Sequence, residues 1–139
     1  DGNLINEISN SDLILLGVSR TGKTPTAIYL ANRGFKTSNI PLVNENSIPL
    51  SLKKNPKSLC VVGLINEAER LVEIRKNRMN ILKETDNTNY TDIGQIRKEV
   101  DDAKKTFRKY NWPTIDVTRK SVEEAAASII KIHEIYKKQ

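Results

Sequence analysis

Cysteine, histidine and aromatic residues are scarce in this chain, and each scarcity narrows the possible functions. The single cysteine, Cys60, allows no internal disulfide, and its place in the apolar run LCVVGLI predicts a buried thiol in a cytoplasmic protein. The single histidine, His133, is expected on the surface or in packing rather than in catalysis. No apolar run approaches the roughly 20 residues that span a bilayer, so no membrane association is expected.

The length of 139 residues suits one compact domain, residues 1–139, with a single modest core. The N-terminal stretch DGNLINEISNSD is polar and has no basic segment followed by an apolar one, so it does not predict a secretory signal. Because the sequence begins with Asp1 rather than with methionine, we expect a fragment or a processed product.

The formal net charge is +6, and the whole excess of basic side chains lies after residue 52. These lysines and arginines are interspersed with glutamates and aspartates, and few aromatic rings are present to stack on bases. Nucleic-acid binding is therefore disfavoured. A solvated helix face together with a phosphate-binding site explains the charge more simply.

Short apolar stretches alternate with stretches of helical periodicity. Strands are predicted at 12–17, 58–65 and 114–118, with weaker strand character at 35–43 and a loop at 44–57. Helices are predicted at 24–33, at 67–84, from Ile93 to Tyr110 and after Ser121, with a polar break at 84–89. Glu124 completes a capping box with Ser121. This alternation predicts an α/β fold, a P-loop NTPase-like parallel sheet flanked by helices, as in small kinases.

The loop after the first strand fits the pattern G-x-x-x-x-G-K-[ST] without a mismatch. Its expected phosphate-binding residues are Gly17, Val18, Ser19, Arg20, Thr21, Gly22, Lys23 and Thr24. Backbone N–H groups and the following helix N-terminus would hold phosphate oxygens, Lys23 would reach the terminal phosphates, and Thr24 would ligate Mg²⁺. Pro25 suits the first helical turn, where its missing N–H has no intrahelical partner.

Two arginines interrupt the apolar side of the helix predicted at 67–84. Arg75 and Arg78 fall among the apolar positions, and Arg70 lies at the edge of the same stripe; the apolar positions are Ala68, Leu71, Ile74, Met79 and Leu82. A guanidinium that faces a core is costly unless it is paired. Either these arginines reach phosphate in the active cleft, or they form buried pairs with carboxylates.

The stretch IDVTRKSVEEAA leaves two interpretations open. Asp116 could belong to a strand–loop–helix unit near the base of a bound nucleotide, as in small P-loop kinases. Alternatively, Asp116 and Thr118 merely cap the next helix. No apolar strand ends in a clear second metal-binding aspartate, so the sequence identifies neither that ligand nor a general base.

These residues resemble a known family over essentially the whole chain. The segments GVSRTGKTPTAIYLANRGFKTSNIPLV, AERLVEIRKNRM, NYTDIGQIRKEVDDAKKTF and WPTIDVTRKSVEEAAASI are similar to the regulatory proteins of pyruvate, phosphate dikinase and phosphoenolpyruvate synthase. Members of this family are bifunctional serine/threonine kinase–pyrophosphorylases. They carry a further N-terminal region of similar size, so the resemblance implies that this chain is the C-terminal, P-loop half of a longer protein.

The resemblance implies an unusual pair of reactions. ADP would be the donor that phosphorylates a threonine of the dikinase and inactivates it, and inorganic phosphate would remove that phosphoryl group as pyrophosphate. Cationic charge on Lys23, Arg20, Arg75 and Arg78 would stabilise the transferring group. The dikinase is favoured over the synthase as the protein substrate. A small-metabolite kinase, and a non-catalytic nucleotide-sensing or nucleic-acid-binding module, are the competing hypotheses.

Overall fold

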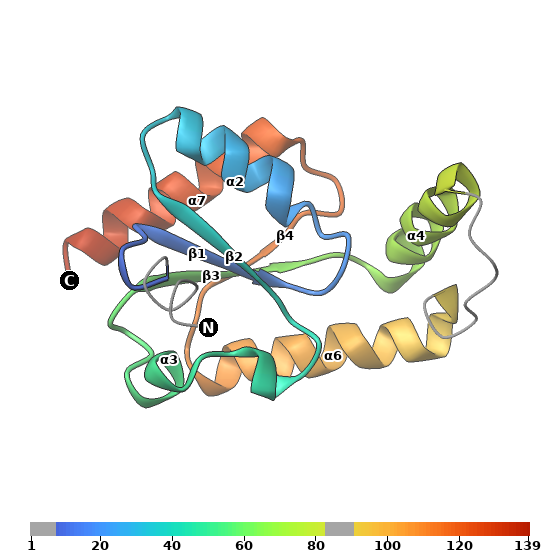
Figure 1. Ribbon diagram of the computed structural model, residues 1–139, viewed down its shortest axis with the longest axis horizontal. Helices are drawn as coiled ribbons and strands as arrows, with labels where there is room; N and C mark the ends of the chain where they lie inside the picture. Colours follow the sequence, from blue (N-terminus) through green and yellow to red (C-terminus); the bar gives the residue numbers. More distant parts are fainter. Residues whose placement is uncertain (1–7, 83–90) are drawn as a thin grey trace.

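The computed structural model describes residues 8–82 and 91–139, which are organised around a four-stranded parallel sheet (Figure 1). The strands are β1 (Leu13–Gly17), β2 (Thr37–Pro41), β3 (Cys60–Ile65) and β4 (Thr114–Asp116). Their order is β2-β1-β3-β4, and every neighbouring pair is parallel. The strand that precedes the glycine-lysine motif is therefore central, and its carboxyl end lies between those of β2 and β3.

Helices cover both faces of this sheet. They are α2 (Lys23–Asn32), α3 (Leu50–Lys54), α4 (Ala68–Leu82), α6 (Ile93–Lys109) and α7 (Val122–Lys137), with a short 3₁₀ helix at Glu45–Ser47. In Figure 1, α2 and α7 lie on one side of the sheet, and α3 and α6 lie on the other. The result is a three-layer α/β/α arrangement, which confirms the fold class predicted from the sequence.

The alternation of side chains along β1 separates two hydrophobic cores. Leu13 and Leu15 pack with residues of α2 and α7, whereas Ile14 and Leu16 pack with residues of α3, α4 and α6. All four leucine and isoleucine side chains are fully buried, which explains the uninterrupted apolar sequence of this strand. The glycine-rich loop therefore follows directly on a fully buried central strand.

Most predicted elements are present with small shifts at their ends. The capping box is confirmed, because Ser121 Oγ accepts from the Glu124 amide at 3.1 Å and Glu124 Oε1 accepts from the Ser121 amide at 3.1 Å. Cys60 is buried as predicted, and burial raises the pKa of its thiol to about 11. The polar break predicted at 84–89 lies outside the described residues, as does the side chain of Leu82.

The segment 44–57, predicted as a loop with one short turn, contains the 3₁₀ helix as such a turn, but the prediction was wrong in part because α3 also lies there. Pro49 stands at the N-cap of α3, and Leu52 anchors the helix with 1% of its surface exposed. A helix of five residues is too short to show helical periodicity in a sequence that is rich in proline and asparagine. Within the described ranges, no helix is long and apolar enough to cross a lipid bilayer.

Candidate phosphate-binding site

The motif Gly17–Thr24 forms a tight loop between β1 and α2. Gly22 is the residue before the helix and has φ of 81°, a left-handed conformation that favours glycine. Pro25 is the third residue of α2 and lies in its first turn, as predicted. Thr21 is buried, and its hydroxyl donates to the carbonyl of Val18 at 3.0 Å. This hydrogen bond links two residues of the loop to each other.

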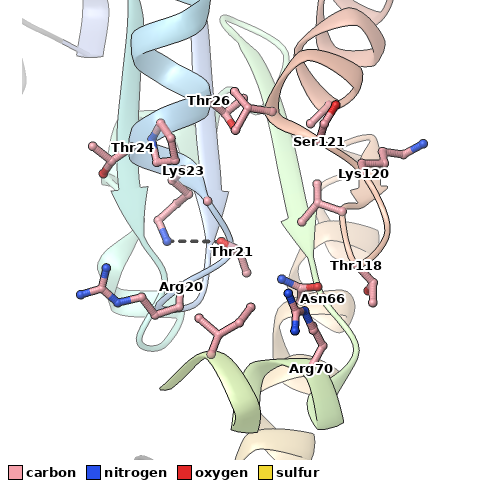
Figure 2. A pocket seen from close by; sticks show the side chains of 16 residues that line it. Arg20, Thr21, Lys23, Thr24, Thr26, Asn66, Arg70, Thr118, Lys120 and Ser121 are labelled. Carbon is pink, nitrogen blue, oxygen red and sulfur yellow. Dashed lines mark hydrogen bonds between the residues drawn. The ribbon is translucent and has the colours of Figure 1, made fainter. Parts of the chain in front are cut away.

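Lys23 lies inside this loop rather than extending into solvent. Its Nζ donates to the carbonyl of Val18 at 2.8 Å. It also donates to Thr21 Oγ1 at 3.4 Å, the bond drawn dashed in Figure 2. Burial, together with the positive charges of Arg20 and Arg75, lowers the pKa of Lys23 from 10.5 to about 8. A charged amine held in a cationic and partly dry environment would gain more than an exposed one from an incoming anion.

A cavity of about 400 Å³ opens beside the loop. Its lining residues come from the loop and α2, from the end of β3 with α4, and from the segment between β4 and α7. They are Arg20, Thr21, Gly22, Lys23, Thr24, Pro25, Thr26, Asn66, Arg70, Ile74, Val117, Thr118, Lys120, Ser121, Val122 and Ala125. Figure 2 shows Asn66 and Arg70 across the cavity from Lys23 and Thr21.

The charge of this cavity suits a polyanion. Arg20, Lys23, Arg70 and Lys120 contribute to its walls, and none of the described lining residues is an aspartate or a glutamate. The N-termini of two long helices, α2 and α7, also open onto it and add partial positive charge. Apolar side chains of Ile74 and of α7 complete the far wall, so a ligand with both phosphates and an apolar ring would be accommodated.

Neither Arg75 nor Arg78, the two arginines predicted on the apolar side of α4, lines the cavity. Arg75 has 1% of its surface exposed and does not line the cavity. Its Nη1 donates to Glu99 Oε2 at 2.7 Å, and its Nη2 donates to the carbonyl of Ser19 at 3.2 Å. The alternative of a buried carboxylate pair is therefore the one that Arg75 adopts, because its face of α4 packs against α6.

Arg78 is exposed and also lies outside the cavity, so the expectation that it shares the buried face was wrong. It projects about 60° around the helix from Arg75, far enough to leave the contact with α6. A role of Arg78 in phosphoryl transfer stays a prediction that its position does not favour.

Arg70 and Asn66 line the cavity wall on which the sequence placed Arg75 and Arg78. Arg70 is half exposed and pairs with Glu73 at 3.0 Å. Asn66 follows β3 directly and has 6% of its surface exposed, and its Oδ1 finds no partner among the described residues. A bound water or a ligand hydroxyl would satisfy this oxygen. Their approach to the loop depends on the place of β3 beside β1 in the sheet, which no local pattern encodes.

Asp116 does not cap the next helix, so that interpretation was wrong, whereas its place in a strand–loop–helix unit near the base of a nucleotide stays a prediction. Although partial burial acts in the opposite direction, hydrogen bonds from the hydroxyl and the amide of Thr118 hold the pKa of Asp116 below its ordinary value. Thr118 Oγ1 in turn accepts from the amide of Glu67 at 2.9 Å, which ties the end of β4 to the start of α4. The cap of α7 is Ser121. Asp116 therefore supports the wall and does not line the cavity.

The polar side chains of the cavity are better suited to binding phosphates than to binding a metal ion through protein ligands alone. Within residues 8–82 and 91–139, no group of three or more histidine, cysteine, aspartate or glutamate side chains could hold a metal ion. Thr24 is exposed at the first turn of α2 and lines the cavity, so its hydroxyl is available as one oxygen ligand. Mg²⁺ commonly takes few protein ligands and completes its shell with phosphates and waters, which is compatible with this arrangement.

Comparison with known proteins assigns the chain that carries this cavity to a family. The sequence profile of the family described as kinase/pyrophosphorylase matches residues 1–130. The chain belongs to the kinase/pyrophosphorylase family. That family description names two phosphoryl-group chemistries, and the cation-lined cavity is suited to the ligands of both.

Relatives in this kinase/pyrophosphorylase family are described as putative pyruvate, phosphate dikinase regulatory proteins. The one from Pelagibacter ubique (strain HTCC1062) is 74% identical over 137 residues, which cover 99% of this chain and 50% of that protein. Those from Maricaulis maris (strain MCS10) and Wolbachia sp. subsp. Brugia malayi (strain TRS) are 50% and 48% identical over 91% and 94% of this chain. These two matches cover 45% and 48% of the respective proteins. The chain therefore spans about half the length of the curated relatives it matches.

Proposed function

We propose that this chain is the phosphate-binding part of a kinase/pyrophosphorylase that regulates pyruvate, phosphate dikinase. In the kinase direction, a threonine hydroxyl of the dikinase attacks the β-phosphate of ADP, and AMP leaves. In the reverse direction, inorganic phosphate attacks the phosphothreonine, which releases pyrophosphate and restores the threonine. The same chemistry on phosphoenolpyruvate synthase is the alternative.

The observation that carries this proposal is the loop folded around Lys23 at a cavity without carboxylates, in a chain of this family. On binding, Lys23 would exchange the carbonyl of Val18 for a phosphate oxygen, which is a stronger acceptor. Arg20 and Arg70 lie on opposite walls and would balance charge on the phosphoryl group as it moves between them. Both directions need two adjacent phosphate positions, and the cationic side chains along this cavity would supply them.

A phosphoryl-transfer assay tests this function. The longer protein that contains this chain is incubated with dikinase and ADP labelled on its β-phosphate, and label should appear on a dikinase threonine with release of AMP. Addition of inorganic phosphate should then form labelled pyrophosphate. Transfer to a nucleoside monophosphate instead would indicate a small-metabolite kinase. Absence of transfer to either acceptor would contradict the proposal.

ADP binding should be linked to the protonation of Lys23. Because the pKa of Lys23 in the free protein is about 8, the amine loses its charge as the pH rises through this value, and ADP affinity should fall. Bound phosphate favours the charged amine and raises its pKa, so binding at pH 8.5 should take up a fraction of a proton. Calorimetric titrations in buffers of different ionisation enthalpy measure this uptake. Equal heats in all buffers would contradict the assignment.

The same pKa has a consequence for the stability of the free protein. Lys23 has a lower pKa folded, about 8, than unfolded, near 10.5, so between these values the unfolded state binds more protons. Its contribution to the free energy of unfolding should therefore rise with pH across this window. Lys23→Met should remove both this slope and the proton uptake.

A further inference from the structure

The buried guanidinium of Arg75 joins three parts of the fold behind the phosphate-binding loop. Arg75 belongs to α4, donates to Glu99 of α6 at 2.7 Å, and donates to the carbonyl of Ser19 in the loop at 3.2 Å. Glu99 is 35% exposed, so the pair is buried at one end only, and the carboxylate compensates the charge. The fork geometry of a guanidinium permits both bonds at once.

The bond from Arg75 fixes the orientation of one peptide group. No described peptide is cis, so the carbonyl of Ser19 and the N–H of Arg20 point in opposite directions. With the carbonyl held on the side of Arg75, the N–H of Arg20 points away from Arg75. Arg20 lines the cavity and Arg75 does not, so an N–H on the side away from Arg75 would be available to an anion in the cavity.

The backbone of Arg20 is strained in this orientation. Its φ is 71°, a left-handed value that is unfavourable for a residue with a Cβ atom. Rotation of the Ser19–Arg20 peptide plane would return φ to a negative value, and it would also turn the Ser19 carbonyl toward the anion site. The hydrogen bond from the charged guanidinium is stronger than one between neutral groups, and it opposes this rotation.

We propose that Arg75 is a positioning residue that keeps the Ser19 carbonyl out of the phosphate site and the Arg20 N–H directed into it. The ligand part of this inference rests on the proposed function, since the anion is taken to be a phosphate of ADP. The conformational part concerns the free protein and stands without it.

The conformational part is tested by NMR on the ligand-free chain. A positive φ brings an amide proton close to its own Hα, so Arg20 should show a strong intraresidue HN–Hα NOE in the wild-type protein. Arg75→Met should weaken this NOE, because the peptide is released. Lys76→Met, which removes an exposed charge next along the same helix, should leave it unchanged. An unchanged NOE in Arg75→Met would overturn the proposal, whatever the variant does to ADP binding.

The functional part is tested by ADP titration of the same variants. Arg75→Met should weaken ADP binding by about tenfold, which corresponds to the loss of one charge-assisted hydrogen bond, and Lys76→Met should stay within about twofold of wild type. If Arg75→Met fails to fold, Arg75→Lys replaces it. Lysine keeps the charge but cannot bond to Glu99 and to the Ser19 carbonyl at the same time. Arg75→Lys should therefore also weaken the NOE and the ADP affinity, but by less than Arg75→Met.

An Arg20→Gly background distinguishes a positioning role of Arg75 from a general loss of structure in the Arg75 variants. Glycine adopts a positive φ without strain, so in an Arg20→Gly background the effect of Arg75→Met on ADP affinity should shrink. An undiminished effect would mean that Arg75 acts through its charge or through folding, and the proposal would fail. If wild type itself binds no ADP while the NOE depends on Arg75, the proposed function fails and the positioning role stands.

Discussion

Replacing Lys23 by methionine should weaken ADP binding by about a hundredfold. Methionine keeps the length of the side chain and removes its ammonium group, which is the buried cation nearest to the centre of the loop. A charge-assisted hydrogen bond to phosphate in such an environment is among the strongest single contacts a protein makes, and about 2.7 kcal/mol corresponds to this loss. Calorimetric titration with ADP and Mg²⁺ measures the change.

Folding should not suffer from the same substitution. Lys23 is buried, and its lowered pKa reflects the cost of keeping its charge there, so the melting temperature of Lys23→Met should equal or exceed that of wild type. The matched control is Lys36→Met, an exposed lysine before β2 at the opposite end of the strands, which should retain wild-type affinity. Equal ADP affinities for wild type and Lys23→Met would refute the loop assignment.

Replacing Gly63 by alanine should destabilise the protein by about 1–3 kcal/mol, a typical cost of overpacking a core. A Cβ atom at this position of β3 would lie 2.5 Å from ring carbons of Phe107, which is fully buried where α6 packs on the sheet. Either the ring or the helix must shift. Thermal or urea unfolding measures the loss, which should lower the melting temperature by several degrees.

A double variant tests whether the loss in Gly63→Ala comes from contact with the Phe107 ring. In the Gly63→Ala background, Phe107→Leu should cost less stability than it does in wild type, because the smaller side chain makes room for the methyl group. Strictly additive losses would show that the two positions do not meet, and the packing of α6 on β3 would need revision.

The loop was predictable from sequence because it is a local structure. The glycines, Lys23 and Thr24 that define the motif lie in one short segment, and the buried strand before them and the helix after them are both encoded within about ten residues of the loop. The capping box of Ser121 and Glu124 was predictable for the same reason. In each case the partners lie within one turn or one strand.

The walls of the cavity were not predictable in this way. Helical periodicity correctly indicated that Arg75 is buried, but it cannot say which neighbour meets that face. The neighbour is Glu99, which follows 24 residues later on another helix. Asn66 and Lys120 reach the cavity only because β3 and β4 end at the same edge of the sheet. Such contacts depend on the order of strands, which the sequence pattern left open.

The most direct test of the central claim is a calorimetric titration of this 139-residue chain with ADP in the presence of Mg²⁺ at neutral pH. The loop, the α2 N-terminus and the cationic walls all lie within it, so binding should be saturable at one site. ADP should also raise the melting temperature, since only the folded state holds the loop. Absence of both binding heat and thermal stabilisation would show that these residues alone do not form the nucleotide site.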